Sequence, residues 1–422
     1  ENLYRDVPTD IDTTTIASLS WREMFTDPKL QSLIETGLER NIDLNVARLR
    51  VEAAEATLLT TKLSYLPSLG LNAEGNANKH DGATAKTYNV GASASWELDI
   101  FGKLTAAKRG AAAALQGSRA YRQAVQTQLV ATIADSYYTL AMLDAQMAIS
   151  NQTLENWRTT VRTLEALKKV GKSNEAGVLQ AKANVMQLEA SLLSIRRSIS
   201  ETENALSTIL AMPSHSIGRS NLAEAVFPDT VSIGVPLQLL SNRPDVRQAE
   251  MELAQAFYAT NAARAAFYPN ITLSGTLGWT NNGGGVIVNP GQWLLNAIGS
   301  LTQPLFNRGT NIANLKIAKT RQEEAKLLFQ QSLLNAGKEV NNALTAWQTT
   351  KSQIEINARQ VETLCDAVRK TESLMRHSNT TYLEVLTAQQ SLLEAEVQQL
   401  QTRFERIQSV IKLYHALGGG RI

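Results

Sequence analysis

The chain has 422 residues, a formal net charge of +2 and 43% apolar residues, as expected for a folded protein of two or three domains. Its near-neutral charge excludes a basic nucleic-acid footprint, so we expect no nucleic-acid partner. The single cysteine, Cys365, excludes an internal disulfide and a cysteine zinc cluster, and no run reaches the ~18 apolar residues of a membrane-spanning helix.

The chain opens at Glu1 without a signal peptide, which is typical of a processed or trimmed N-terminus. Its ten prolines are unevenly placed and leave two long stretches, 68–212 and 305–422, without any. Because proline interrupts helices, these two stretches are where we expect long helices.

The first candidate strands precede the first long helix. Between residues 88 and 100 apolar and polar residues alternate with the period of an amphipathic strand, and 68–78 is a plausible partner. The pattern fits a membrane barrel with a wet lumen, and equally a soluble hairpin with one buried face. In a barrel, Tyr88, Val90, Ala92, Trp96 and Leu98 would face lipid, whereas Gly91, Ser93, Ser95 and Glu97 would face the lumen. Gly91 should then tolerate even an arginine side chain.

A long helix is predicted next. Residues 104–170 are rich in good helix formers, and one continuous helix there would be about 100 Å long. Gly171 and the polar residues after it predict a turn. Apolar residues then alternate steps of three and four from Val185 to Ile209, and again from Leu393 to Tyr414. This spacing favours long antiparallel hairpins with coiled-coil-like packing over a short bundle core.

The two halves of the chain resemble each other, which indicates an internal duplication. Tyr65-Leu66-Pro67 matches Phe267-Tyr268-Pro269, and Val178-Leu179-Gln180-Ala181 matches Val385-Leu386-Thr387-Ala388. The second half accordingly predicts a strand over 270–280, with the poorly alternating segment 291–303 beside it. Four strands are too few to close a barrel, because even small barrels need about eight. Either the sheet packs on other elements, or several chains share one barrel.

With these motifs and this duplication the chain resembles the TolC-like outer-membrane factors, in particular the lipoprotein branch that serves RND-type efflux pumps. The resemblance runs from about Trp21 to Gly420. Five motifs in family order carry it: Trp21-Arg22-Glu23-Met24-Phe25-Thr26-Asp27-Pro28, Leu239-Leu240-Ser241-Asn242-Arg243-Pro244-Asp245, Ala265-Ala266-Phe267-Tyr268-Pro269, Gln303-Pro304-Leu305-Phe306-Asn307-Arg308-Gly309 and Leu413-Tyr414-His415-Ala416-Leu417-Gly418-Gly419-Gly420.

The resemblance implies a mixed, mainly α fold. Long antiparallel helical hairpins would form a periplasmic α-barrel, and four strands per chain would contribute to a shared 12-stranded outer-membrane β-barrel in a trimer. It also divides the chain into an N-terminal equatorial segment (1–30), a first structural repeat (31–212, with a strand pair over 68–100), an equatorial linker (213–240), a second repeat (241–417, with a strand pair over 269–304) and a C-terminal tail (418–422).

The implied function is a passive conduit of a tripartite pump that exports small molecules across the outer membrane of a Gram-negative bacterium. The expected partners are two further copies of the chain, a periplasmic adaptor, an inner-membrane RND-type pump and outer-membrane lipid. A lipid anchor, usual in this branch, would lie upstream of Glu1. The alternatives are a type I secretion duct, and a periplasmic coiled-coil adaptor, which would have one hairpin instead of two.

Residues of the second hairpin tip are the candidate gate. In relatives this tip lines the closed aperture with an apolar ring and a carboxylate ring. Leu383 resembles the apolar position, whereas Thr387 stands at the carboxylate position, so Glu384 would have to supply the acidic ring. Arg376 and His377 complete the candidate gate, unless the charges are ordinary solvated tip residues. On the first tip, Gly171, Lys172 and Ser173 are the expected adaptor contact.

Neither the Arg243-Pro244-Asp245 motif nor the four histidines of the chain indicates a catalytic site. Arg243-Pro244-Asp245 is interpreted as structural: Asp245 would cap the following helix and Arg243 would form an ion pair. The four histidines, His80, His215, His377 and His415, lack metal-ligand spacing, and no phosphate-binding or nucleophile motif occurs. We therefore expect no enzyme activity, no cofactor and no metal.

Overall fold

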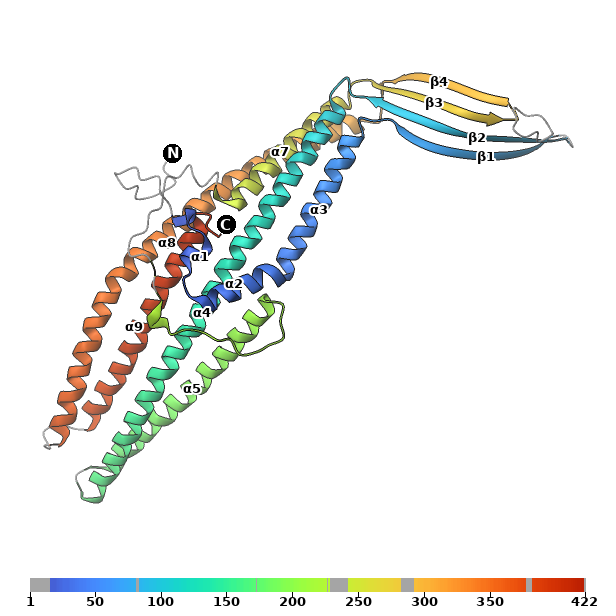
Figure 1. Ribbon diagram of the computed structural model, residues 1–422. Coiled ribbons are helices and arrows are strands. Elements are labelled where there is room, and N and C mark those ends of the chain that lie inside the picture. The colour runs from blue at the N-terminus through green and yellow to red at the C-terminus, as the bar shows by residue number, and fades with distance from the viewer. Residues whose placement is uncertain are drawn as a thin grey trace, which may run out of the picture. The chain divides into compact units, whose positions relative to one another are not determined.

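The computed structural model describes residues 16–80, 83–171, 173–225, 227, 242–281, 292–376 and 382–420. The chain is mainly helical and has one four-stranded antiparallel sheet, as predicted (Figure 1). It divides into two compact units. Unit 1 comprises Glu1–Val46, Arg122–Pro244 and Leu333–Ile422, and unit 2 comprises Ala47–Tyr121 and Asp245–Ser332. Over the described part of the chain, no helix is both long and apolar enough to cross a membrane.

The described helices repeat in length between the halves. The three helices of the first half have 22, 67 and 35 residues, and so do their counterparts in the second half. They are α3 (Ile42–Leu63), α4 (Lys103–Lys169) and α5 (Glu175–Ile209), then α7 (Pro244–Ala265), α8 (Thr310–Arg376) and α9 (Tyr382–Ala416). Shorter helices precede them: η1 (Ile16–Ser18), α1 (Trp21–Met24) and α2 (Pro28–Arg40), with η2 (Leu222–Glu224) after α5. This match supports the duplication, while the repeat bounds given above stay predictions.

The sheet of unit 2 has the strand order β1-β2-β3-β4. Its strands are β1 (Ser68–His80), β2 (Ala83–Leu98), β3 (Asn270–Thr280) and β4 (Gln292–Thr302). The register places apolar residues opposite apolar ones and polar opposite polar: Trp96 lies opposite Leu273, and Ser95 lies opposite Ser274. Because side chains alternate between faces, the sheet has one mainly apolar and one mainly polar face, as the alternation predicts.

One expectation for this sheet is wrong. Gly91 cannot accept an arginine without a backbone shift, because it pairs directly with Gly278. A Cβ atom on Gly91 would lie 2.7 Å from the Leu277 carbonyl oxygen and 2.9 Å from the Gly278 Cα. A Cβ on Gly278 would lie 2.3 Å from the Val90 carbonyl oxygen. The alternation correctly groups Gly91 with the polar face, but it carries no information about how closely two strands approach.

Unit 1 contains two antiparallel helical hairpins: the part of α4 from Arg122 onward with α5, and the part of α8 from Leu333 onward with α9 (Figure 1). The predicted heptad positions form their interior: Leu188, Leu192, Ile195 and Ile199 are buried on α5, as are Leu400, Phe404, Ile407 and Ile411 on α9. Leu154 and Trp157 of α4 pack against Leu188 and Leu192 in one apolar cluster. The length of these hairpins therefore depends on a continuous apolar seam, as in coiled coils.

Three segments far apart in sequence meet around α4 in unit 1. Asp27, the N-cap of α2, accepts a hydrogen bond of 2.6 Å from the Tyr137 hydroxyl, which in turn accepts one of 2.8 Å from the Ser220 backbone. Arg219 forms ion pairs of 2.5 Å with both Asp144 of α4 and Glu203 of α5. The segment after α5 is thus fastened to both helices of the first hairpin.

Candidate functional site at the hairpin tips

The tip of the first hairpin is a short capped turn. The Gly171 amide donates to the Lys168 carbonyl at 3.0 Å, and the Asn174 side chain caps α5 by accepting from the Gly177 amide at 2.9 Å. Lys168 forms an ion pair with Glu175, so part of the basic charge predicted for this tip is neutralised. Of the expected adaptor contact, Gly171 is exposed, Ser173 is half-buried and Lys172 lies outside the described residues.

The second tip presents one exposed face of α9. Leu383, Glu384 and Thr387 are all exposed, and Leu383 is 56% accessible. Spacings of three and four place them on the same side of the helix. Val385 and Leu386 are buried. The structure therefore brings three of the five candidate gate residues together. Arg376 ends α8 without a described side chain, and His377 lies outside the described residues.

The two tips are packed against each other. Leu164, Val178 and Ala181 of the first hairpin form an apolar cluster with Leu386 of the second. Tyr382 packs at its margin, and a Cβ atom on Gly177 would lie only 2.7 Å from the Tyr382 ring. A larger residue at 177 would displace the Tyr382 ring, so glycine permits the close approach of α5 and α9. This contact was not predicted from the sequence, although a glycine three residues after the Asn174 cap is a signal for it.

A buried polar contact also joins the hairpins. Gln389 of α9 is only 6% exposed, and its amide nitrogen donates to the Glu372 carboxylate at 2.9 Å and to the Thr160 hydroxyl of α4 at 3.2 Å. Such a group is costly to bury without partners, so this contact favours one relative placement of the two hairpins. No sequence signal pointed to it, because the partners lie far apart in the chain.

The Arg243-Pro244-Asp245 motif has the predicted ion pair but not the predicted cap. The Arg243 side chain is 4% exposed, lies 2.7 Å from the Glu339 carboxylate and donates to the Ala416 carbonyl at 3.0 Å. Pro244 is the first residue of α7, a favoured position for proline. Asp245 is therefore the second residue of α7 and lies in its first turn, so its assignment as the N-cap is wrong. The cap position belongs to Arg243.

Among the described residues, no group of three or more His, Cys, Asp or Glu side chains could hold a metal ion. What the tips offer is a pair of hairpin ends held together by apolar packing and by one polar contact, with an exposed apolar and acidic face on α9. This arrangement suits contact with other protein surfaces.

The family model for outer membrane efflux proteins matches residues 33–212 and 235–419. The chain belongs to this family. Cation efflux system protein CusC of Escherichia coli O6:H1 is 32% identical over 95% of this chain and 88% of its own length. Pyoverdine export outer membrane protein OpmQ of Pseudomonas putida is 30% identical over 98% of this chain and 90% of its own length. The open-state crystal structure of the Neisseria gonorrhoeae MtrE outer membrane channel superposes with a TM-score of 0.87 at 30% identity, and it covers 98% of this chain and 94% of that one.

The chain is thus an outer-membrane efflux channel protein that extends into the periplasm. The relatives are channel components of efflux systems, not enzymes, and they do not favour the secretion-duct or adaptor alternatives.

Proposed function

We propose that three copies of this chain form one closed conduit through the outer membrane. The observation that carries the proposal is the open sheet: within the described chain β1 and β4 have only one strand neighbour each. Apolar side chains on these strands are strongly exposed, including Leu71 at 89% and Leu295 at 79%. Three sheets joined edge to edge would give twelve strands, remove every free edge and turn the apolar face toward lipid.

Native mass spectrometry from mild detergent tests the assembly. The proposal predicts a species of three chains, each of 46.1 kDa. A species of one chain that retains the full strand signal in circular dichroism would contradict it. Lysine at Leu71 and at Leu295 should shift the population toward single chains. Lysine at Glu74, an exposed position on the opposite face of β1, is the control and should leave the trimer intact.

The second hairpin tip is the proposed gate. Three-fold symmetry would gather Leu383, Glu384 and Thr387 into rings of three, with Arg376 and His377 nearby. The leucine ring would exclude water and hydrated ions, as apolar constrictions do. The glutamates would repel each other until a basic group or a bound cation offset their charge. Thr387 adds no charge, which leaves Glu384 as the acidic position of this gate.

Disulfide trapping tests this geometry. Leu383→Cys, in a Cys365→Ser background, should form interchain disulfides within the trimer under mild oxidation. Leu179 of α5 is the matched control, because it is 57% exposed and Leu383 is 56% exposed. Cross-linking through Leu179→Cys alone would place the aperture elsewhere.

The remaining partners are a periplasmic adaptor and an inner-membrane pump of the RND type. We propose that the adaptor contacts the first tip at Gly171, Lys172 and Ser173, and that the pump selects the cargo. A non-selective duct is supported by the names of the relatives, because CusC is named for cations and OpmQ for pyoverdine at similar identity. Lys172→Glu should reduce co-purification of the adaptor while the trimer mass stays unchanged. Equal adaptor recovery would remove Lys172 from the contact.

A further inference from the structure

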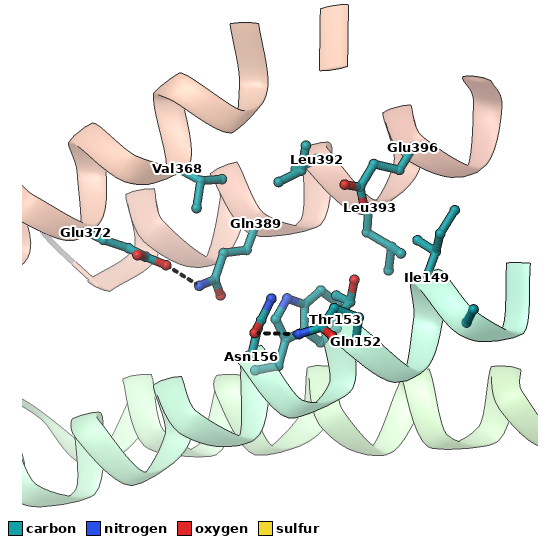
Figure 2. Close-up of a pocket in the computed structure, with 12 residues that line it drawn as sticks. Ile149, Gln152, Thr153, Asn156, Val368, Glu372, Gln389, Leu392, Leu393 and Glu396 are labelled. Carbon is teal, nitrogen blue, oxygen red and sulfur yellow. Dashed lines mark hydrogen bonds between the residues drawn. The ribbon is translucent and has the colours of Figure 1, made fainter. Parts of the chain in front are cut away.

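A pocket of about 360 Å³ lies between the two hairpins of unit 1, and the Gln389–Glu372 contact forms part of its lining. Residues 148–157 of α4 form one wall, and α8 and α9 form the other. Figure 2 shows Gln152, Thr153 and Asn156 of α4 across from Gln389 and Leu393 of α9. The volume lies at the lower end of the range of about 300–1,000 Å³ that small-molecule sites occupy.

Two groups in this pocket lack hydrogen-bond partners within the described chain. The indole Nε1–H of Trp157 is buried and unpaired, and the Trp157 side chain as a whole is 7% exposed. Glu396 is half-buried, and no hydrogen bond or ion pair joins it to another described residue. Burial accordingly raises the pKa of the Glu396 carboxyl. The buried Trp157 donor is left unpaired at some energetic cost, the half-buried Glu396 carboxylate has no described cation beside it, and one ligand could satisfy both.

The charge and shape of the lining restrict the class of ligand. Glu372 and Glu396 lie toward opposite ends of the pocket, with Leu392 and Leu393 between them (Figure 2). None of the twelve described lining residues is basic. Glu372 already accepts from Gln389, which leaves Glu396 as the free anion. A ligand therefore needs a cationic group for Glu396, an apolar body for the leucines and an acceptor for the Trp157 N–H.

We propose that this pocket binds compact amphipathic amines that carry a hydrogen-bond acceptor, such as an ester, amide or ether oxygen. The ammonium group pairs with Glu396, the acceptor takes the Trp157 N–H, and the apolar body lies on Leu392 and Leu393. Trp157 is held by the apolar cluster around Leu188 and Leu192, so the donor is positioned before a ligand arrives. The site lies in the wall between the hairpins, and none of Leu383, Glu384 and Thr387 lines it.

Isothermal titration calorimetry of the intact assembly in non-ionic detergent, with micelle-only heats subtracted, tests the proposal. The probes are procaine, which has a tertiary ammonium and an ester, and benzocaine, which has the ester but no aliphatic amine. Glu396→Gln should weaken procaine binding about tenfold or more and leave benzocaine unchanged, because only procaine loses a charge-assisted contact. Trp157→Phe should weaken both probes by roughly two- to tenfold, the range for a neutral hydrogen bond.

Glu394→Gln is the matched control. Glu394 is an exposed carboxylate on the same helix, it does not line the pocket, and its loss should change neither affinity. The proposal is overturned if procaine gives no heat above the micelle background. It is equally overturned if procaine binds wild type, Glu396→Gln and Trp157→Phe alike. Native mass spectra of the two pocket variants show whether they still assemble, so a lost affinity can be assigned to the pocket.

Discussion

The close approach of β2 and β3 makes a sharp prediction for Gly91→Ala. The new Cβ would lie 2.7 Å from the Leu277 carbonyl oxygen, whereas ordinary contacts begin near 3.4 Å, so the two strands must separate by several tenths of an ångström. Overpacking of this kind destabilises the folded state by about 1–3 kcal/mol. Alanine also reduces the conformational entropy of the unfolded chain, which stabilises the folded state by about 0.4–1 kcal/mol. We therefore expect the free energy of unfolding to fall by roughly 1–2 kcal/mol per chain, and a trimer would contain three such chains.

Gly75→Ala is the control, because no atom lies within 4 Å of a Cβ at that position of β1. It should leave stability unchanged or raise it by up to about 1 kcal/mol. Gly278→Ala should cost at least as much as Gly91→Ala, because its Cβ would approach the neighbouring strand more closely. The double variant should cost less than the sum, because one strand displacement relieves both contacts. The assay is reversible urea unfolding in lipid vesicles, followed by the strand signal. Equal stability of Gly91→Ala and Gly75→Ala would refute the reasoning.

Three further predictions concern unit 1. Arg243→Ala should lower the free energy of unfolding by about 2–3 kcal/mol in a denaturant titration, because it removes a buried charge-assisted contact. Arg22→Ala is the control: it removes an exposed ion pair and should lower the free energy of unfolding by at most about 1 kcal/mol. Gly177→Ala should speed amide exchange at the hairpin tips, and Tyr382→Ala in the same chain should restore protection; no effect of the single change would exclude the tight contact. Burial acts to raise the pKa of Asp27, but its hydrogen bonds outweigh this and lower it. The stability that Asp27 contributes is thus present above its unfolded pKa of about 4 and is lost as pH falls through the lower folded value, so Asp27→Asn should flatten the acid limb of a stability–pH curve.

Long-range periodicity explains why much of the fold could be predicted. The helix expected over 104–170 is Lys103–Lys169, and the strand expected over 270–280 is Asn270–Thr280. The start of β2 was missed by five residues, since it begins at Ala83 and not at 88. Residues 83–87 carry no large apolar side chain, and their strand depends on backbone pairing with β1, which composition does not report.

Contacts between distant segments explain why much of the site could not be predicted. The spacing of Leu383, Glu384 and Thr387 indicates a shared face of a helix, and the structure has it. Nothing in the spacing of Gln389 or Gly177 indicates a neighbour on the other hairpin, because register between two hairpins is set by their packing. The Asp245 cap was wrong for a simpler reason: the helix starts at Pro244, two residues earlier than a capping aspartate at 245 requires.

Single-channel conductance in planar lipid bilayers tests the central claim, a trimeric conduit closed at the second hairpin tip. Wild type should conduct poorly, and Leu383→Ala or Glu384→Lys should raise the conductance or the open probability. Leu179→Ala, which truncates an equally exposed leucine of the first hairpin, should behave as wild type. A wild-type protein that conducts as a wide-open pore, or a pore that opens through Leu179→Ala but not through Leu383→Ala, would contradict the account.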